Sequence, residues 1–488
     1  MRNFNLLCST ILIFTTLFST AQTADSTNDL PEIVVNAFEQ NRRLKDVGAA
    51  IHILSAKTLD RFNAASIVHA INTTPGVRME ERSPGSYRIN IRGSSLRSPF
   101  GVRNVKVYYN DIPITDPGGN TYLNQLGFYN YVSIEIIKGP GSSLYGAGTG
   151  GVLLINNTFS NEEAGAMLQY TAGSYALHNI YASVRTNSAT MQSTVGFQHQ
   201  QSNGYRQHSN MRRNILSYGT QIKLSESSQL KTSFMYADLF YQTPGALTRT
   251  EFTANAKASR PGNANFPGAV AAQASVMQKQ LIAGASLTQT LSKWLQNKTV
   301  LYGMFTEMRN PNIQNYSRNT EPHGGLRNHF QFSKEKNTHT YNLQIGGEAQ
   351  AGFATVSIHK NAAGQPDTLR SVDAIRNIQW LAFAQANFEN NHWIISTGAS
   401  VNFLKVRLER FTPAPVNEKR SFSNGFTPRI SILKKLKNVN VYVVVSKGFS
   451  PPTTAELLPT GGAINLDLNA ESGWNYEAGL KGTFLKRV

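Results

Sequence analysis

From about residue 165 onward, apolar and polar residues alternate with a period of two. Ala166, Leu168 and Tyr170 fall on one face of an extended chain, and Gln169 and Thr171 fall on the other. The same alternation recurs over residues 180–185, 341–348, 393–403 and 474–484. Segments of strand length with aromatic residues near their ends are typical of transmembrane β-barrels. A soluble β-sandwich also alternates and is the alternative for this pattern alone.

Polar stretches rich in Gly or Asn separate these segments and have two lengths. The long stretches cover residues 202–213, 245–268 and 451–467. In an outer-membrane barrel the short connections are periplasmic turns, and the long ones are extracellular loops. With roughly 25 residues for each strand and its connection, the pattern predicts about 12 to 14 antiparallel strands.

The chain begins with the features of a secretory signal. Arg2 supplies a positive charge, residues 6–18 are apolar, and Ser19, Thr20 and Ala21 suit a signal peptidase. We expect residues 1–21 to be removed, and with them the single cysteine, Cys8; an N-terminal anchor helix is the alternative. No later apolar run approaches the ~18 residues of a spanning helix, so a membrane would have to be crossed by strands.

A glycine-rich segment at residues 134–156 is the most informative part of the chain. It is one of six motifs in a fixed order: Thr74-Pro75-Gly76-Val77, Ile91-Arg92-Gly93, Val107-Tyr108-Tyr109-Asn110-Asp111-Ile112-Pro113, Ile134-Glu135-Ile136-Ile137-Lys138-Gly139-Pro140, Leu144-Tyr145-Gly146 and Gly150-Gly151. Each motif is weak alone. Together they resemble the plug domain of TonB-dependent outer-membrane receptors.

This resemblance implies a membrane all-β barrel, antiparallel and of about 22 strands, with an N-terminal mixed α/β plug domain. The expected divisions are a signal peptide at 1–21, a flexible segment at 22–39, the plug at 40–158 and the barrel at 159–488. Because the strand estimate falls short of 22, we expect an incomplete barrel that lacks about 200 residues at its C-terminal side. Its unpaired edges should be the strands near residues 165–172 and 474–484.

Within the plug, the spacing of apolar residues predicts a helix over residues 60–71. Phe62, Ile67, Val68 and Ile71, with Leu59 just before them, fall close to one helical face, and Pro75-Gly76 follows.

An apolar, β-branched octamer follows the polar residues 22–29. Its residues are Leu30, Pro31, Glu32, Ile33, Val34, Val35, Asn36 and Ala37. Such a segment suits addition to the sheet edge of a partner, although it could be an ordinary first strand of the plug. In the resembled family this position holds the TonB box, which the inner-membrane TonB complex binds to deliver energy. The short spacer before it leaves no room for an N-terminal signalling domain.

The formal net charge is +18, with a pI near 9.8. Basic residues are spread along the chain and no nucleic-acid-binding motif accompanies them, so nucleic acid is not an expected partner. Two interpretations stay open: an anionic ligand, or lipopolysaccharide phosphates held by surface cations. The ligand-binding candidates are Arg82, Arg97, Asn120, Tyr122 and Gln125 in the plug, and Arg206, Arg212, Arg249 and Arg260 in the barrel loops.

The segment from Tyr241 to Thr248, with Phe252 and Ser259-Arg260-Pro261, resembles a loop of ferric-citrate and ferric-siderophore receptors. The resemblance therefore implies active import of an anionic metal chelate. Cobalamin, haem, nickel and oligosaccharides are alternative cargoes, and a passive channel or adhesin is an alternative class. Gly146 to Gly151 superficially resembles a phosphate loop but lacks the following Lys-Ser/Thr. No catalytic or metal-ligand motif appears, so we expect neither an enzyme nor a cofactor.

Overall fold

The computed structural model describes residues 34–63, 65–83, 85–94, 101–127, 129, 131–157, 164–458, 464–465 and 467–482. The expected signal peptide, box residues 30–33 and Arg97 lie outside these ranges. Residues 35–488 form one compact unit. In the part of the chain that the structure describes, no helix is both long and apolar enough to cross a membrane.

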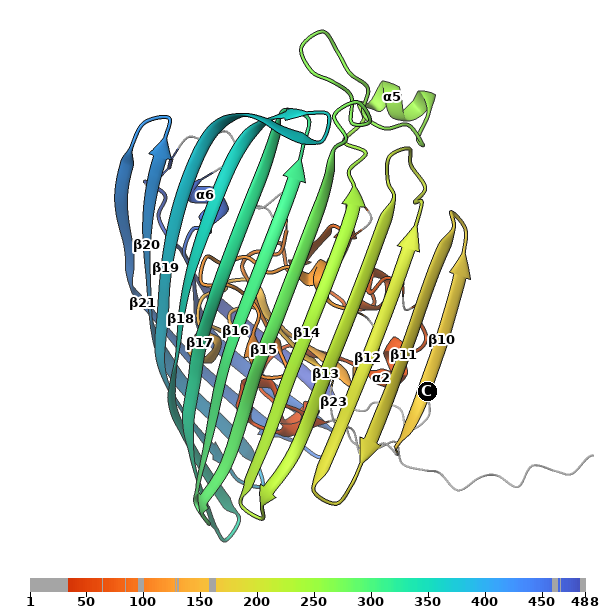
Figure 1. The fold of residues 1–488 in the computed structure, drawn as a ribbon. Coiled ribbons are helices and arrows are strands. Elements are labelled where there is room, and N and C mark those ends of the chain that lie inside the picture. Colours follow the sequence, from red (N-terminus) through yellow and green to blue (C-terminus); the bar gives the residue numbers. More distant parts are fainter. Residues whose placement is uncertain are drawn as a thin grey trace, which may run out of the picture. The chain divides into compact units, whose positions relative to one another are not determined.

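The C-terminal two thirds of the chain form one antiparallel sheet (Figure 1). Its strands, each paired with the next along the chain, are β10 (Gly165–Gly173), β11 (Leu177–Asn187), β12 (Met191–Ser202), β13 (Met211–Ser225), β14 (Ser228–Gln242), β15 (Ser275–Ser292), β16 (Leu295–Pro311), β17 (Asn315–Lys336), β18 (His339–Ala362), β19 (Gln365–Glu389), β20 (Trp393–Thr412), β21 (Val416–Lys435), β22 (Val439–Ser450) and β23 (Glu471–Gly482). Two short helices, α5 (Arg249–Ala254) and α6 (Thr454–Leu457), lie in the long connections.

The alternation of the sequence becomes the two faces of this sheet. Along β19, the side chains of Gln379, Leu381 and Gln385 are buried, whereas those of Ile378 and Trp380 are exposed. Because successive side chains point to opposite faces, Gln379, Leu381 and Gln385 face the interior, whereas Ile378 and Trp380 face outward. This arrangement confirms the barrel pattern predicted from period two.

The sheet has the two edges that the sequence predicted. Fourteen strands are described, within the expected 12 to 14, and no described residue of β10 pairs with β23. Leu168 of β10 is 76% exposed and Tyr476 of β23 is 74% exposed. Each edge strand therefore pairs with one neighbour only, β10 with β11 and β23 with β22, and carries exposed apolar side chains.

The N-terminal part is a mixed α/β plug, as predicted. Its elements are β1 (Val34–Val35), η1 (Ala37–Glu39), β2 (Arg42–Arg43), η2 (Leu44–Asp46), β3 (Ile51–Ser55), α2 (Ala56–Leu59), α3 (Val68–Ile71), β4 (Val77–Glu81), β5 (Tyr87–Ile91), β6 (Val105–Tyr109), β7 (Ile112–Pro113), η3 (Leu123–Gln125), β8 (Ser133–Lys138), α4 (Ser142–Tyr145) and β9 (Gly151–Asn156). The central sheet has the order β3-β8-β9-β6-β7, in which only β6 and β9 are parallel neighbours.

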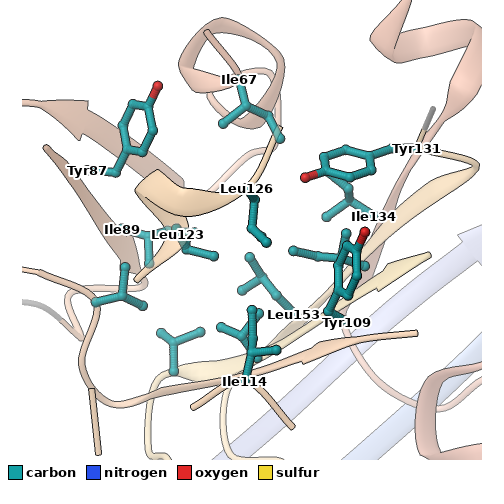
Figure 2. Close-up of a cluster of buried hydrophobic side chains, with 14 of the residues drawn as sticks. Ile67, Tyr87, Ile89, Tyr109, Ile114, Leu123, Leu126, Tyr131, Ile134 and Leu153 are labelled. Atoms are coloured by element: carbon teal, nitrogen blue, oxygen red, sulfur yellow. The ribbon is translucent and has the colours of Figure 1, made fainter. Parts of the chain in front are cut away.

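The plug core continues into the inner face of the barrel. Leu123, Leu126, Ile134 and Leu153 point toward one another in the core (Figure 2). The same buried cluster includes barrel residues such as Ile215, Met235, Ile282, Val300 and Tyr302. The plug therefore packs against the concave face of the sheet, and burial of this apolar area holds the two parts together.

The predicted helix over residues 60–71 is wrong. Helix α2 ends at Leu59, and α3 begins only at Val68. The Asn63 side chain accepts a hydrogen bond from the Ala65 amide at 2.7 Å, and the Ser66 hydroxyl accepts one from the Val68 amide at 3.4 Å. These local side-chain bonds take amides that a continuous helix would bond to its own carbonyls.

Candidate functional site

The plug motifs hold the plug to the barrel wall through charged groups. Arg92, from the Ile-Arg-Gly motif, forms an ion pair of 2.6 Å with Glu477 on β23. The Tyr442 hydroxyl donates to the other Glu477 oxygen at 2.8 Å. Lys138 donates to the Pro75 carbonyl at 2.7 Å and joins two plug motifs to each other. Arg92 thus links the plug to the barrel wall, and Lys138 links two segments of the plug.

A second, more deeply buried network surrounds Glu348 on β18. Its carboxylate lies 3.0 Å from Lys106 Nζ and 3.2 Å from Arg327 Nη1, and it accepts a hydrogen bond from the Tyr108 hydroxyl at 2.8 Å. Side-chain exposure is 2–3% for all three charged groups. Because each charge is compensated, the network fixes the plug strand β6 against β17 and β18.

A neighbouring ion pair joins the plug loop after β6 to β16. Lys298 Nζ lies 2.7 Å from the Asp111 carboxylate. Burial raises the pKa of Asp111, but the charges of Lys298 and Lys231 and the hydrogen bond from Lys298 together outweigh burial, and the pKa falls to about 2. Asp111 is therefore ionised throughout the physiological range.

The candidates in the plug lie in two different loops. Arg82 is exposed in the turn between β4 and β5, where Gly85 meets the Tyr241 ring of β14. Tyr122 donates to Glu321 of β17 at 2.9 Å, and the Asn120 amide donates to Asp116 at 2.9 Å. Gln125 is fully buried, and its side chain donates to the Gln278 carbonyl at 3.4 Å. Asn120, Tyr122 and Gln125 thus stabilise the loop between β7 and β8, whereas Arg82 is exposed to solvent.

The candidate arginines in the long loops are of two kinds: some hold the loops together and form a loop scaffold, and one is exposed. Arg206 donates to the carbonyls of Gly245 and Ala258 at 2.8 Å, so it joins the loop after β12 to the loop after β14. Arg260 packs beside Gly245 in the same scaffold. Arg249 is exposed at the start of α5, whose capping box is formed by Thr248 and Glu251. The structure brings Arg206 and Arg260 together, and no described contact joins them to Arg82.

The sequence identified Arg212 as a candidate but missed its neighbour Arg213, which contacts the plug. Arg212 is exposed and lies 3.6 Å from Asp238, whereas Arg213 is fully buried. Arg213 donates to the Asn124 and Leu126 carbonyls of the plug, each at 3.2 Å. Period two requires neighbours to face opposite ways, but both faces of β13 carry apolar residues, so alternation could not identify the inner arginine.

The last residues of the predicted box are fixed to the plug. The Glu135 carboxylate on β8 accepts hydrogen bonds from the Asn36 and Ala37 amides, both at 2.9 Å. The Tyr145 hydroxyl accepts one from the Phe38 amide at 2.7 Å. Burial raises the pKa of Glu135 from 4.5 to about 7, and the two amide donors only partly oppose this shift.

The shift of Glu135 predicts a pH dependence of stability. Between pH 4.5 and 7 the folded chain holds a proton that the unfolded chain has lost, so stability falls as pH rises through this window. The contribution is at most roughly 3 kcal/mol. We expect Glu135→Gln to flatten the decrease in unfolding temperature between pH 5 and 8 in detergent. Equal slopes for the variant and the unaltered chain would contradict this assignment.

Among the described residues, no group of three or more His, Cys, Asp or Glu side chains is placed to hold a metal ion. The candidate site thus consists of an exposed arginine on the plug, arginines in the long loops, and an anchored box at the opposite end.

Comparison with known proteins agrees with this architecture. Residues 43–152 match the TonB-dependent receptor plug domain, and residues 220–487 match the TonB-dependent receptor-like β-barrel. Among solved structures, the unliganded ferric citrate transporter FecA is similar with a TM-score of 0.77 and 14% identity, over 93% of this chain and 70% of that chain. The ferric yersiniabactin receptor FyuA from Yersinia pestis is similar with a TM-score of 0.68 and 11% identity, over 89% and 70%. Such low identities show the fold alone.

A curated relative matches a shorter stretch. The vitamin B12 transporter BtuB of Vibrio vulnificus is 27% identical over 153 residues, which are 31% of this chain and 24% of that protein. The matched stretch thus spans about a quarter of the relative. Since the barrel match alone covers more than half of the chain, and the plug match precedes it in the family order, this chain belongs to the TonB-dependent receptor family.

Proposed function

We propose that this chain imports an anionic, oxygen-liganded iron complex, a ferric citrate or ferric siderophore, across the outer membrane of a Gram-negative bacterium. Binding of TonB to the box supplies the energy. The observation that carries this proposal is the junction between the box and the plug, where Glu135 and Tyr145 hold the amides of residues 36–38. A pull on the box is therefore transmitted to the central sheet of the plug. The family is one of receptors and not of enzymes.

The positive charge supports an anionic ligand. The chain has a formal net charge of +18, and arginines lie in the long loops and in the plug turn between β4 and β5. Guanidinium groups bind carboxylate or catecholate oxygens in a bidentate manner. The fold shared with the ferric citrate transporter FecA and the ferric yersiniabactin receptor FyuA supports an iron complex.

A cobalamin is the second candidate. The similarity to the vitamin B12 transporter BtuB favours it, because that match rests on sequence identity.

Outward-facing cations support lipopolysaccharide as a lipid partner. Lys279 on β15 and Arg318 on β17 are exposed, and the register places Arg309 of the intervening strand β16 opposite Arg318. Phosphate groups of the outer leaflet supply the matching charge.

Neutralising three candidate arginines, the exposed Arg82 and Arg249 and the half-buried Arg260, is expected to weaken binding of ferric citrate. The variant Arg82→Gln, Arg249→Gln, Arg260→Gln removes three charges and spares Arg206, which holds the loops together. We expect an affinity at least about tenfold lower by isothermal titration calorimetry. Arg212→Gln, on the outer face of the sheet, is the matched control and should bind normally.

Two results would redirect the proposal. Unchanged affinity of the triple variant would place the ligand site elsewhere. Binding of cyanocobalamin by the unaltered chain, without binding of ferric citrate or a ferric siderophore, would favour the second candidate.

A further inference from the structure

Residues 36–48, here called the strap, cover the inner wall of the barrel near its short turns. Beyond the box junction, the strap contacts β16 to β23 rather than the plug sheet alone. Residues Phe38, Glu39 and Asn41 have φ values of 59°, 54° and 46°. Non-glycine residues adopt this left-handed region only when their surroundings impose it. The contacts with the wall therefore hold the strap in its path.

In most contacts between the strap and the wall, the wall supplies the hydrogen-bond donor and the strap supplies the acceptor. The Gln344 and Gln385 amides donate to the carbonyls of Glu39 and Phe38, at 2.8 and 3.1 Å. Arg429 donates to the Gly48 carbonyl at 2.6 Å. The wall thus supplies donors, and the strap supplies carbonyl oxygens.

Cations complete this donor surface. Lys481 donates to the Leu44 and Val47 carbonyls at 3.1 and 2.7 Å. The Glu39 carboxylate lies 3.8 Å from both Lys298 and Arg327. Some contacts run the other way, since Gln40 donates to Asn387 and Ser396, and Arg42 pairs with Glu389. They lie at the rim, next to the turn between β19 and β20.

Removal of the strap would leave positive charge in excess on the wall. Lys298 would keep Asp111, and Arg327 would keep Glu348. Arg429 and Lys481 form no ion pair within 4 Å with any described residue, and both would lose the strap carbonyls together. Glu477, the wall carboxylate whose charge acts on both, already pairs with Arg92 and accepts from Tyr442. Buried cations without acceptors are costly, and an oxygen-rich anion restores what the strap supplied.

We propose that the wall beneath the strap is a second binding site for the oxygen-rich anionic ligand, uncovered when the strap is withdrawn. Its donors are Lys298, Arg327, Gln344, Gln385, Arg429 and Lys481. Because these residues lie at the end opposite the long loops, the site serves the ligand as it leaves the barrel. The strap occupies the site in the resting chain and mimics the ligand with its own oxygens. This transit role rests on the proposed import function, whereas the anion site itself does not.

The first test asks whether the wall attracts anions, independently of transport. Ser431 donates to the Gly48 carbonyl at 2.7 Å and shares the inner face of β21 with Arg429. Ser431→Cys in a Cys8→Ser background, with Glu39→Ala and Glu135→Ala to release the strap, gives a full chain with one reporter thiol. A sulfonate-bearing methanethiosulfonate should label it at least about fivefold faster than the trimethylammonium reagent. Millimolar citrate should slow both reagents.

The control is the same reporter chain with Arg429→Gln and Lys481→Gln, in which the preference for the anionic reagent should disappear. Equal rates for both reagents in the reporter chain would overturn the site. A thiol that stays unreactive would also count against the proposed site. It would show that the strap stays bound to the wall even without its Glu39 and Glu135 contacts, and so cannot be withdrawn.

The second test concerns transit. In whole cells, Arg429→Gln with Lys481→Gln should lower uptake of labelled ferric citrate at least about tenfold, with surface binding unchanged. Lys435→Gln is the matched control, since Lys435 lies near the same end but pairs with Glu389 at 2.6 Å. Normal uptake by the double variant would overturn the transit role. Anion-selective labelling without uptake by the unaltered chain would count against the transit role and leave the anion site standing.

Discussion

Replacing Val34 by proline is expected to reduce energised uptake to background while binding at the cell surface stays within about twofold. A strand added to the sheet of TonB needs backbone N–H donors, and proline has none. Val34 is half exposed and lies in β1, which pairs with the short strand β2. Residues 36–38 keep their hydrogen bonds to Glu135 and Tyr145, so the plug should fold normally.

Uptake of labelled ferric citrate and binding to de-energised cells are the two measurements. Val34→Thr keeps the N–H group and the β-branched shape, and it should transport normally. Deletion of residues 30–37 should reproduce the proline phenotype. Uptake that survives both the proline change and the deletion would show that the octamer is not the coupling segment.

The strand pattern could be predicted from sequence because it depends on local geometry. Each residue in a strand faces opposite to its neighbour, so Ile378 and Gln379 reveal their faces without knowledge of the partner strand. The number of strands and the identity of the two edges follow from the same count. The plug motifs added the mixed α/β domain, since their order is specific even though each one is weak.

Contacts between distant segments could not be predicted in this way. Alternation shows that Glu348 faces the interior, but not that Lys106, which is 242 positions earlier in the sequence, lies at the same height. The error over residues 60–71 has another origin. Apolar spacing favoured one helix there, while the side chains of Asn63 and Ser66 satisfied the backbone locally and interrupted it.

The structure separates the candidate ligand residues into buried ones that stabilise loops and exposed ones that a ligand could reach. Arginines were chosen for their chemistry, and that criterion does not distinguish Arg206, which joins two loops, from Arg249, which is exposed. The inner wall beneath the strap carried no recognisable motif. Its donors come from many strands, and only the fold brings Gln344, Gln385 and Arg429 to one surface.

Removing the carboxylate of Glu348 is expected to cause the largest loss of stability. Glu348→Leu leaves Lys106 and Arg327 buried without their common partner. Breaking a buried pair in this way costs about 3–5 kcal/mol, because one charge loses its compensation. Thermal unfolding in detergent should shift to lower temperature, and proteolysis of the plug should accelerate.

Two companion variants make this prediction specific. Glu307→Gln removes an acid of the same kind from the outer face, where its pair with Arg309 is partly exposed, and it should cost about 0–1 kcal/mol. The double variant Glu348→Leu, Lys106→Met removes one buried cation together with the acid and should recover part of the lost stability, because Arg327 retains Glu39 and the Leu144 carbonyl. A Glu348→Leu chain as stable as Glu307→Gln would show that apolar packing alone seats the plug. A double variant less stable than Glu348→Leu would show that Lys106 contributes through packing rather than charge.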